Sequence, residues 1–262
     1  MLSLEVGGST VCLHHFAPAT NDSKRTSVLL IPGWPAVGED ILGLGSALSD
    51  RGVHVFTLHP RGHAPSGGEA TFANALQDVA AAWKWLGSQG AADQFALAPE
   101  RRILAGYSWG GGIALAFAAQ EPTVTRIASI AGSDHGVFIR RMDSDPEYRA
   151  IYRAALVSTQ APEGPVRFDV DRDLEELRSG EKIHDLVTIA PRLADRDLLI
   201  IGGWDDDQVE LEHQVLPFYR ALRASGAERV RALMFQDGHG FTTVRGPLAE
   251  AVYGWLSVER KP

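Results

Sequence analysis

The sequence has 262 residues, of which 45% are hydrophobic, and a formal net charge of −8 at pH 7. This length suits one large α/β domain, and the acidic balance, without a cluster of Lys and Arg, argues against nucleic acid as a partner. The single cysteine, Cys12, excludes an intrachain disulfide and favours a reducing, cytoplasmic location.

The N-terminal stretch MLSLEVGGSTVCLHHF has neither the basic region nor the apolar region of a signal peptide. Further along the chain, the longest apolar runs have the length of strands, well below the roughly 20 residues that a membrane span needs. Neither an export signal nor a membrane span is therefore expected.

Short apolar runs bounded by turn residues predict six buried strands, at 27–33, 52–60, 101–108, 125–133, 197–205 and 229–237. Helical patterns lie between and after them, at 75–90, 111–120, 211–226 and 247–259. Alternation of buried strands with helices is typical of a mostly parallel sheet that is covered by helices on both faces. The fold class predicted from this alternation is α/β.

Residues 134–190 interrupt the alternation with a polar segment longer than a crossover helix requires. The segment contains DPEYRAIYRAAL, a loop rich in Pro and Gly, and DLEELRSG. Such an insertion is either a functional lid or a tolerated surface excursion. Because the predicted fold places it above the carboxyl ends of the strands, we favour a lid within a single domain that spans residues 1–262.

The stretch LAGYSWGGG, at 104–112, places Ser108 between Gly106 and Gly110, after a predicted strand and before a predicted helix. A G-x-S-x-G match alone is weak, since short patterns of common residues recur by chance. Between a strand and a helix, however, the two glycines permit a sharp turn that exposes the serine Oγ at a helix N-terminus. Ser108 is therefore the candidate nucleophile.

A serine nucleophile needs a base and an acid that orients the base. His239 is the candidate base, because it lies on the loop between the last predicted strand and the last predicted helix. Asp205, Asp206 and Asp207 follow the fifth strand, so that the chain order is Ser, Asp, His. Burial of all three carboxylates would be costly, so at most one should face His239, and composition does not choose among them.

With these residues in place, the chain resembles the α/β-hydrolase fold superfamily from about residue 27 to 258. Within it, the chain is most similar to small serine esterases and peptidase-like hydrolases near dienelactone hydrolase. The acid strand of that family ends in Gly, two residues, Asp, two residues and Val, which implies Asp206 in GWDDDQV, with Asp205 next. A rarer family variant carries the acid after the preceding strand, and there Asp134 is the candidate.

An oxyanion hole requires two main-chain N–H donors. Trp109, the residue after the nucleophile, is expected to supply one of them. The resemblance implies Trp34 for the other, since family members usually carry His-Gly-x-Pro where this chain has Pro32-Gly33-Trp34-Pro35. Pro35 has no N–H, and Pro32 stands in place of a histidine that usually braces the loop.

The stretch HPRGHAPSGG, at 59–68, resembles the family pattern Asp-x-Arg-Gly-His-Gly-x-Ser, with His59 in place of Asp and Ala64 in place of Gly. We interpret this loop as structural, and a role for His63 or His59 at the rim of the pocket stays open.

Aromatic residues adjoin the predicted site in the sequence: Trp34 and Trp109 beside the oxyanion hole, and Trp204 and Phe241 beside the acid and the base. These rings either line a pocket for an acyl or aryl ester or simply pack around the loops. The chain contains no zinc-binding or nucleotide-binding pattern, so neither a metal nor another cofactor is expected.

The function predicted from the sequence is a serine hydrolase that cleaves a small-molecule carboxylic ester through an acyl-enzyme. A small-peptide or amide hydrolase is the first alternative, because DGHGF before the last helix resembles prolyl-oligopeptidase-like enzymes. A non-catalytic ligand binder of the same fold is the second alternative. The sequence leaves open whether the chain forms a homo-oligomer.

Overall fold

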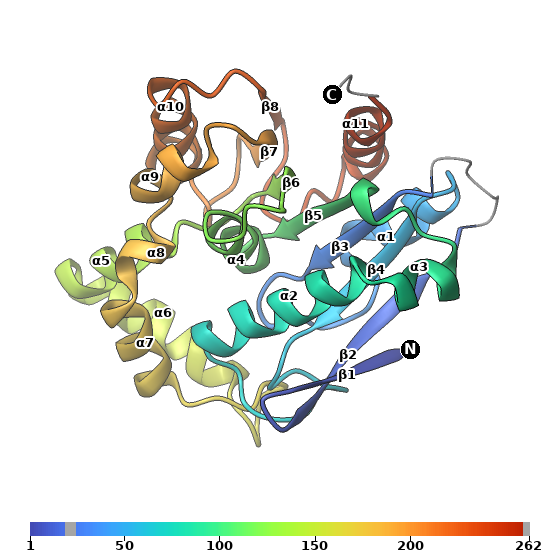
Figure 1. The fold of residues 1–262 in the computed structure, drawn as a ribbon. Coiled ribbons are helices and arrows are strands. Elements are labelled where there is room, and N and C mark those ends of the chain that lie inside the picture. Colours follow the sequence, from blue (N-terminus) through green and yellow to red (C-terminus); the bar gives the residue numbers. More distant parts are fainter. Residues whose placement is uncertain (19–24, 259–262) are drawn as a thin grey trace.

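The computed structural model describes residues 1–18 and 25–258, in which eight strands form a single twisted sheet (Figure 1). Their spatial order is β1-β2-β4-β3-β5-β6-β7-β8, and all neighbouring pairs from β4 to β8 are parallel. The strands are β1 (Leu2–Val6), β2 (Ser9–Phe16), β3 (Ser27–Ile31), β4 (His54–His59), β5 (Arg102–Tyr107), β6 (Arg126–Ile130), β7 (Asp197–Gly203) and β8 (Val230–Phe235).

The six parallel strands are those predicted from the apolar runs, each slightly shorter than its run. Every residue of β3 and β7 is buried, as expected for strands that are covered on both faces. The antiparallel hairpin β1–β2 extends one edge and pairs with β4. In β1 the exposure of the residues alternates, because only one side of this edge strand packs on the protein.

Helices cover both faces of the sheet, which confirms the predicted fold class. Helices α2 and α4 pack together on one face, while α1 and α11 contact each other on the opposite face (Figure 1). The helices are α1 (Leu44–Ser49), α2 (Phe72–Leu86), α3 (Gln89–Phe95), α4 (Trp109–Ala118), α5 (His135–Ser144), α6 (Pro146–Thr159), α7 (Val170–Ser179), α8 (Glu181–His184), α9 (Leu186–Ile189), α10 (Leu216–Ala224) and α11 (Arg245–Ser257).

The four predicted helices correspond to α2, α4, α10 and α11, with shifts at their ends. The segment 211–215 forms a π-helical turn that leads into α10. The predicted end of the last helix, at residue 259, lies outside the described residues. None of the described helices has both the length and the apolar character needed to cross a lipid bilayer.

The insertion between β6 and β7 folds into the five short helices α5 to α9. Figure 1 shows α5, α6 and α7 gathered beyond the carboxyl ends of β5 and β6, the edge where the chain turns into α4. Helix α6 has no fully buried residue, and its main packing partners are α5 and α7. The insertion therefore covers one edge of the sheet, and helices other than α6 add buried side chains such as Ile139, Leu177 and Ile189 to the hydrophobic core.

The loop at 59–68 is tied to α2 by a buried ion pair. The Nε atom of Arg61 lies 2.6 Å from Oδ1 of Asp78, and the Arg61 main-chain N–H donates to Oδ2 of the same carboxylate at 2.7 Å. Ser66 Oγ donates to the carbonyl oxygen of His59 at 2.5 Å and accepts the N–H of Cys12 at 2.8 Å. These contacts fasten the loop to strand β2 and helix α2, in agreement with its structural interpretation.

Two fully enclosed histidines make the fold sensitive to acid. Burial lowers the pKa of His63 to about 4 and that of His184 to about 4, against 6.5 for an ordinary histidine. Between about pH 4 and 6.5 the unfolded chain therefore binds protons that the folded chain does not. As the pH falls through this window, each of these histidines lowers the free energy of unfolding by up to about 3 kcal/mol. Above about pH 6.5 the histidines do not change it.

We expect His184→Phe to flatten the dependence of unfolding free energy on pH between about 6.5 and 4. The phenyl ring keeps the edge-on packing that His184 makes with Phe72, at 4.9 Å between ring centroids, but cannot take up a proton. Urea titrations over this range should show a slope about 1.4 kcal/mol per pH unit shallower than in the parent protein. Equal slopes in the two proteins would contradict the assignment of a neutral, buried His184.

Candidate active site

Ser108 occupies a sharp turn between β5 and α4. Its backbone has φ 54° and ψ −123°, a conformation with positive φ that is strained for any residue other than glycine. Surrounding main-chain groups hold the turn: the Ser108 N–H donates to the carbonyl of Ile130 at 2.9 Å. Its own carbonyl accepts the N–H groups of Gly111 at 2.9 Å and Ser133 at 3.0 Å. The turn leaves Ser108 at the N-terminus of a fully buried helix.

Gly106 and Gly110 are the two residues that let the chain close around this turn. A Cβ added to Gly106 would lie 2.2 Å from the carbonyl oxygen of Gly110, and one added to Gly110 would lie 2.3 Å from that of Pro32. Both distances are far below a van der Waals contact. The close approach of strand, helix and neighbouring loop thus explains the two glycines of G-x-S-x-G.

Ser108, His239 and Asp206 form one hydrogen-bonded chain, although they lie far apart in the sequence. The Oγ of Ser108 lies 2.9 Å from Nε2 of His239, and Nδ1 of His239 lies 2.8 Å from Oδ2 of Asp206. Because a carboxylate only accepts, this contact places the imidazole proton on Nδ1. Nε2 is then free to accept the hydroxyl proton of Ser108.

The Asp206 carboxylate is itself fixed by the turn after β7. Its Oδ1 accepts the N–H groups of Gln208 at 2.9 Å and Val209 at 2.8 Å, and the residue is only 6% exposed. Asp205, one residue earlier, is exposed and accepts a hydrogen bond from Gln236 at 2.8 Å. Of the adjacent carboxylates, the structure therefore brings Asp206 to His239.

Asp134, the alternative acid, forms its side-chain hydrogen bonds with the helices of the insertion. Its carboxylate caps α5 by accepting the N–H of Val137 at 3.0 Å, and it also accepts the N–H of Leu186 at 3.2 Å. Burial raises the pKa of this carboxyl to about 6. Asp134 thus joins two helices of the insertion and makes no contact with His239.

Two further groups that sequence reasoning missed position His239. The phenol of Tyr107 donates to the carbonyl oxygen of His239 at 3.0 Å, and burial raises the pKa of Tyr107 to about 12, so that the donor proton is retained. The carboxylate of Asp237 accepts the N–H groups of Gly238 and Thr243, each at 2.8 Å. For Tyr107, the position directly before Ser108 is the one sequence signal that could have indicated this role; for Asp237 the sequence offers none.

The two tryptophans of the predicted oxyanion hole, Trp34 and Trp109, adjoin residues that lie at the Ser108 turn. Trp109 follows Ser108 as the first residue of α4, and Gly33, which precedes Trp34, comes so close that an added Cβ would lie 3.1 Å from Cβ of Ser108. Neither main-chain N–H of the two tryptophans donates to an acceptor in the part of the chain that the structure describes. The indole of Trp34 donates to Thr159 Oγ1 at 3.0 Å, so the insertion braces the loop that lacks the usual histidine.

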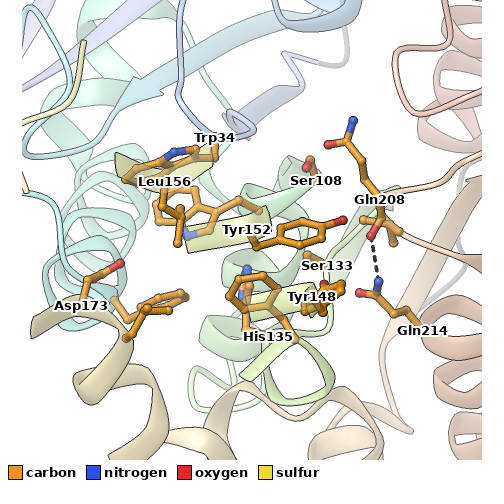
Figure 2. A pocket seen from close by; sticks show the side chains of 15 residues that line it. Trp34, Ser108, Ser133, His135, Tyr148, Tyr152, Leu156, Asp173, Gln208 and Gln214 are labelled. Atoms are coloured by element: carbon orange, nitrogen blue, oxygen red, sulfur yellow. Dashed lines mark hydrogen bonds between the residues drawn. The ribbon is translucent and has the colours of Figure 1, made fainter. Parts of the chain in front are cut away.

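A cavity of about 180 Å³ opens next to Ser108, and six of the 15 residues that line it are Trp, Phe or Tyr (Figure 2). Trp34 and Trp109 line it from the sheet side, and helices of the insertion supply the opposite wall. The other lining residues are Phe72, Ser133, His135, Phe138, Tyr148, Tyr152, Leu156, Asp173, Leu174, Gln208, Val209 and Gln214. Tyr148, Tyr152 and Leu156 are four residues apart and share one face of α6.

The predicted pocket residues Trp204 and Phe241 do not line this cavity. Trp204 is 54% exposed at the end of β7, where its ring faces solvent. Phe241 is fully buried and packs edge-on against Phe235, because its backbone has φ 47° and turns the side chain into the core. Of the two alternatives that the sequence left open, Phe241 fits packing around the loops, since closeness in sequence to Asp206 and His239 does not fix the direction of a side chain.

His63 packs edge-on against Trp34, with 5.2 Å between ring centroids, but neither His63 nor His59 belongs to the cavity wall. In the described residues, no group of three or more His, Cys, Asp or Glu side chains is arranged to hold a metal ion.

The alpha/beta hydrolase fold family matches residues 26–161, slightly more than half of the chain. No curated protein matches the sequence. Solved structures match over nearly the whole chain but at low identity, so they show the likeness of the fold alone.

Est1E from Butyrivibrio proteoclasticus, with ferulic acid bound, is 16% identical with a TM-score of 0.69 and covers 98% of both chains. The esterase Pf2001 from Pyrococcus furiosus is 14% identical with a TM-score of 0.68, over 97% of this chain and 88% of the esterase. A protein assigned as a dienelactone hydrolase from Klebsiella pneumoniae is 16% identical with a TM-score of 0.65, over 98% and 97% of the two chains.

Proposed function

The chain belongs to the alpha/beta hydrolase fold family, and within that family we propose that it is a serine hydrolase that cleaves carboxylic esters through an acyl-enzyme. The observation that carries this proposal is the hydrogen-bonded chain from Ser108 Oγ through His239 to Asp206, with both distances below 3 Å. A serine on a strained turn, a histidine within reach of its Oγ and a carboxylate behind that histidine are what nucleophilic acyl transfer requires.

In the first half of the reaction, Ser108 Oγ attacks the ester carbonyl carbon while His239 Nε2 takes the hydroxyl proton. The tetrahedral intermediate collapses as His239 delivers that proton to the alcohol oxygen, which leaves. Asp206 keeps the imidazole in the required tautomer and stabilises its protonated form. In the second half, His239 activates a water molecule that attacks the acyl-enzyme, and Ser108 recovers its proton.

The developing oxyanion needs donors that are in place before the reaction. The N–H groups of Trp34 and Trp109 fit this role, because the two residues adjoin the Ser108 turn and no described acceptor uses these N–H groups. Donors of this kind supply about 3–4 kcal/mol of transition-state stabilisation each in other serine hydrolases.

The aromatic wall of the cavity favours an ester whose acyl part carries an apolar or aromatic group. Trp34 and Trp109 lie 5.9 Å apart, with their rings inclined by 65°, and the ring of Tyr152 faces the same space from α6 (Figure 2). Flat rings pack well against such walls. The bound ferulic acid of Est1E, which also carries an aromatic ring, supports this choice.

The insertion at 134–190 acts as a lid in this proposal, within one domain that spans the chain. Helix α6 presents Tyr148, Tyr152 and Leu156 to the cavity, while Ile151 and Val157 on its other side are 60% and 44% exposed. Because α6 packs mainly on other helices of the insertion, it can move without disturbing the sheet.

Covalent labelling tests the proposed function directly. A fluorophosphonate should modify the folded protein at one site, and peptide mass mapping should place the adduct on Ser108. Ser108→Ala should remain unlabelled, while Ser133→Ala, which removes another hydroxyl of the same cavity, should label like the parent. Absence of labelling in the folded parent protein would favour the non-catalytic binder. If Ser108 is labelled, hydrolysis rates on a panel of esters and arylamides separate esterase from amidase activity.

A further inference from the structure

Asp173, on the first turn of α7, places a carboxyl group in the wall of the aromatic cavity. Figure 2 shows it on the opposite side of the cavity from Ser108. Its Oδ1 is inaccessible to solvent and has no hydrogen-bond partner among the described residues. A buried acceptor without a partner is costly, and such a group in a folded protein calls for an explanation, such as a bound water molecule or ion.

None of the described cations forms an ion pair with this carboxyl group. Arg172, its neighbour on α7, pairs instead with Glu69 at 2.7 Å. Burial and the negative charge of Glu176, opposed by a main-chain hydrogen bond from Phe72 and by the charge of Arg172, raise the pKa of Asp173 to about 7. The far end of the cavity therefore holds a carboxyl group whose ionised form a cation beside it would stabilise.

The nearby histidines do not supply that charge. His135 lines the cavity and His184 packs behind it, with 5.8 Å between the two rings. Burial lowers the pKa of His184 to about 4 and that of His135 well below its ordinary value. Both rings are thus neutral at physiological pH, and neither supplies a positive charge to Asp173.

The walls around Asp173 suit a cation as well. Trp34, Phe72 and Tyr152 all line the same cavity, and the faces of aromatic rings attract ammonium groups. A neutral hydroxyl near Asp173 would leave the charge of the carboxylate without compensation. An ammonium group balances that charge and contacts the rings.

We propose that the cavity binds esters whose acyl group carries a protonated amine at its far end, with Asp173 as the counter-ion. This inference rests on the proposed esterase function for its orientation. His239, which must deliver a proton to the leaving alcohol, does not line the cavity, whereas Ser108 does. The cavity therefore holds the acyl side of the ester.

Three matched methyl esters test the inference: 3-phenylpropanoates that carry a para aminomethyl, hydroxymethyl or ethyl group. These groups have nearly the same size but differ in charge and in donor capacity. We expect kcat/KM for the aminomethyl ester to exceed that for the ethyl ester by about 10- to 100-fold, as for other hydrogen bonds to charged groups. The hydroxymethyl ester should lie between them.

Asp173→Asn should reduce this aminomethyl-to-ethyl ratio to about 1. Asp171→Asn is the matched control, because Asp171 is an exposed carboxylate on the same helix that pairs with Arg153 at the surface. It should retain the ratio of the parent protein. A parent that prefers the ethyl or hydroxymethyl ester, or a preference that survives Asp173→Asn, would overturn the inference.

Binding to the Ser108→Ala protein separates this inference from the esterase proposal. Trp34 and Trp109 line the cavity, so quenching of tryptophan fluorescence reports Kd for each ester without hydrolysis. If the aminomethyl ester binds about tenfold or more tightly than the ethyl ester while the parent hydrolyses neither, the cation site stands and the esterase proposal fails. Equal Kd values would refute the cation site whatever the hydrolytic activity.

Discussion

Ser108→Ala should lower kcat for p-nitrophenyl acetate and p-nitrophenyl butyrate by about 10⁴-fold or more. In the proposed mechanism, the substitution removes the atom that forms the acyl-enzyme, whereas the N–H groups of Trp34 and Trp109 remain in place. The fold should survive, because the main-chain hydrogen bonds that hold the turn do not involve Oγ. Initial rates at saturating ester, together with circular dichroism, provide the measurement.

His239→Ala should cost nearly as much as Ser108→Ala, and the double variant hardly more than either. Groups that act in one proton transfer are strongly non-additive, because removal of one leaves the other without a function. Independent losses that multiply in the double variant would argue against the 2.9 Å contact between Ser108 and His239 as the catalytic one. Retained turnover in Ser108→Ala would refute the nucleophile outright.

The parallel part of the fold was predictable because its signal is local. A strand covered on both faces must be apolar at every position, as SVLLI and DLLIIGG are, and helices alternate with such strands. The turn at Ser108 was predictable for the same reason, since two glycines four positions apart mark a close approach of backbone. Once the strand order is known, loops that follow different strands meet at one edge of the sheet.

The cavity was not predictable, because the residues that form it come from packing between helices of the insertion. Tyr148, Tyr152 and Leu156 share one face of α6, but the sequence does not say whether that face meets the core, another helix or an open space. Asp173 lies in a charged stretch, DRDLEELRS, that is typical of a solvated helix. Only the docking of α7 against α2 and α5 buries one of its carboxyl groups.

The choice among the three adjacent carboxylates was left open in the sequence and depends on one turn. The chain turns as it leaves β7, so that Trp204 and Asp205 face solvent while Asp206 is buried. The N–H groups of Gln208 and Val209 then fix one carboxylate oxygen, which aims the other at Nδ1 of His239. Asp205 and Asp206 have the same side chain and differ only in position, so the same substitution at each of them tests which carboxylate acts on His239.

Asp206→Asn should lower kcat by about 10³- to 10⁴-fold, while Asp205→Asn should change it by less than about threefold. The amide can offer its N–H₂ group to Nδ1 of His239, which moves the imidazole proton to Nε2 and leaves no acceptor for the Ser108 hydroxyl. The amide oxygen can still accept from Gln208 and Val209, so the turn keeps its shape. Both variants remove one negative charge at the end of β7, and the Asp205 variant thus controls for long-range electrostatics.

The pH dependence of the activity of the Asp206 variant distinguishes a His239 in the wrong tautomer from a damaged fold. If the defect lies in the tautomer of His239, activity should recover at alkaline pH, where hydroxide in place of the histidine can take the proton of Ser108. Fluorophosphonate labelling should slow in parallel with kcat, since both reactions need an activated Ser108 Oγ. Equal losses in the Asp205 and Asp206 variants would instead show that the acid acts through its charge, and the 2.8 Å contact to His239 would then carry no special weight.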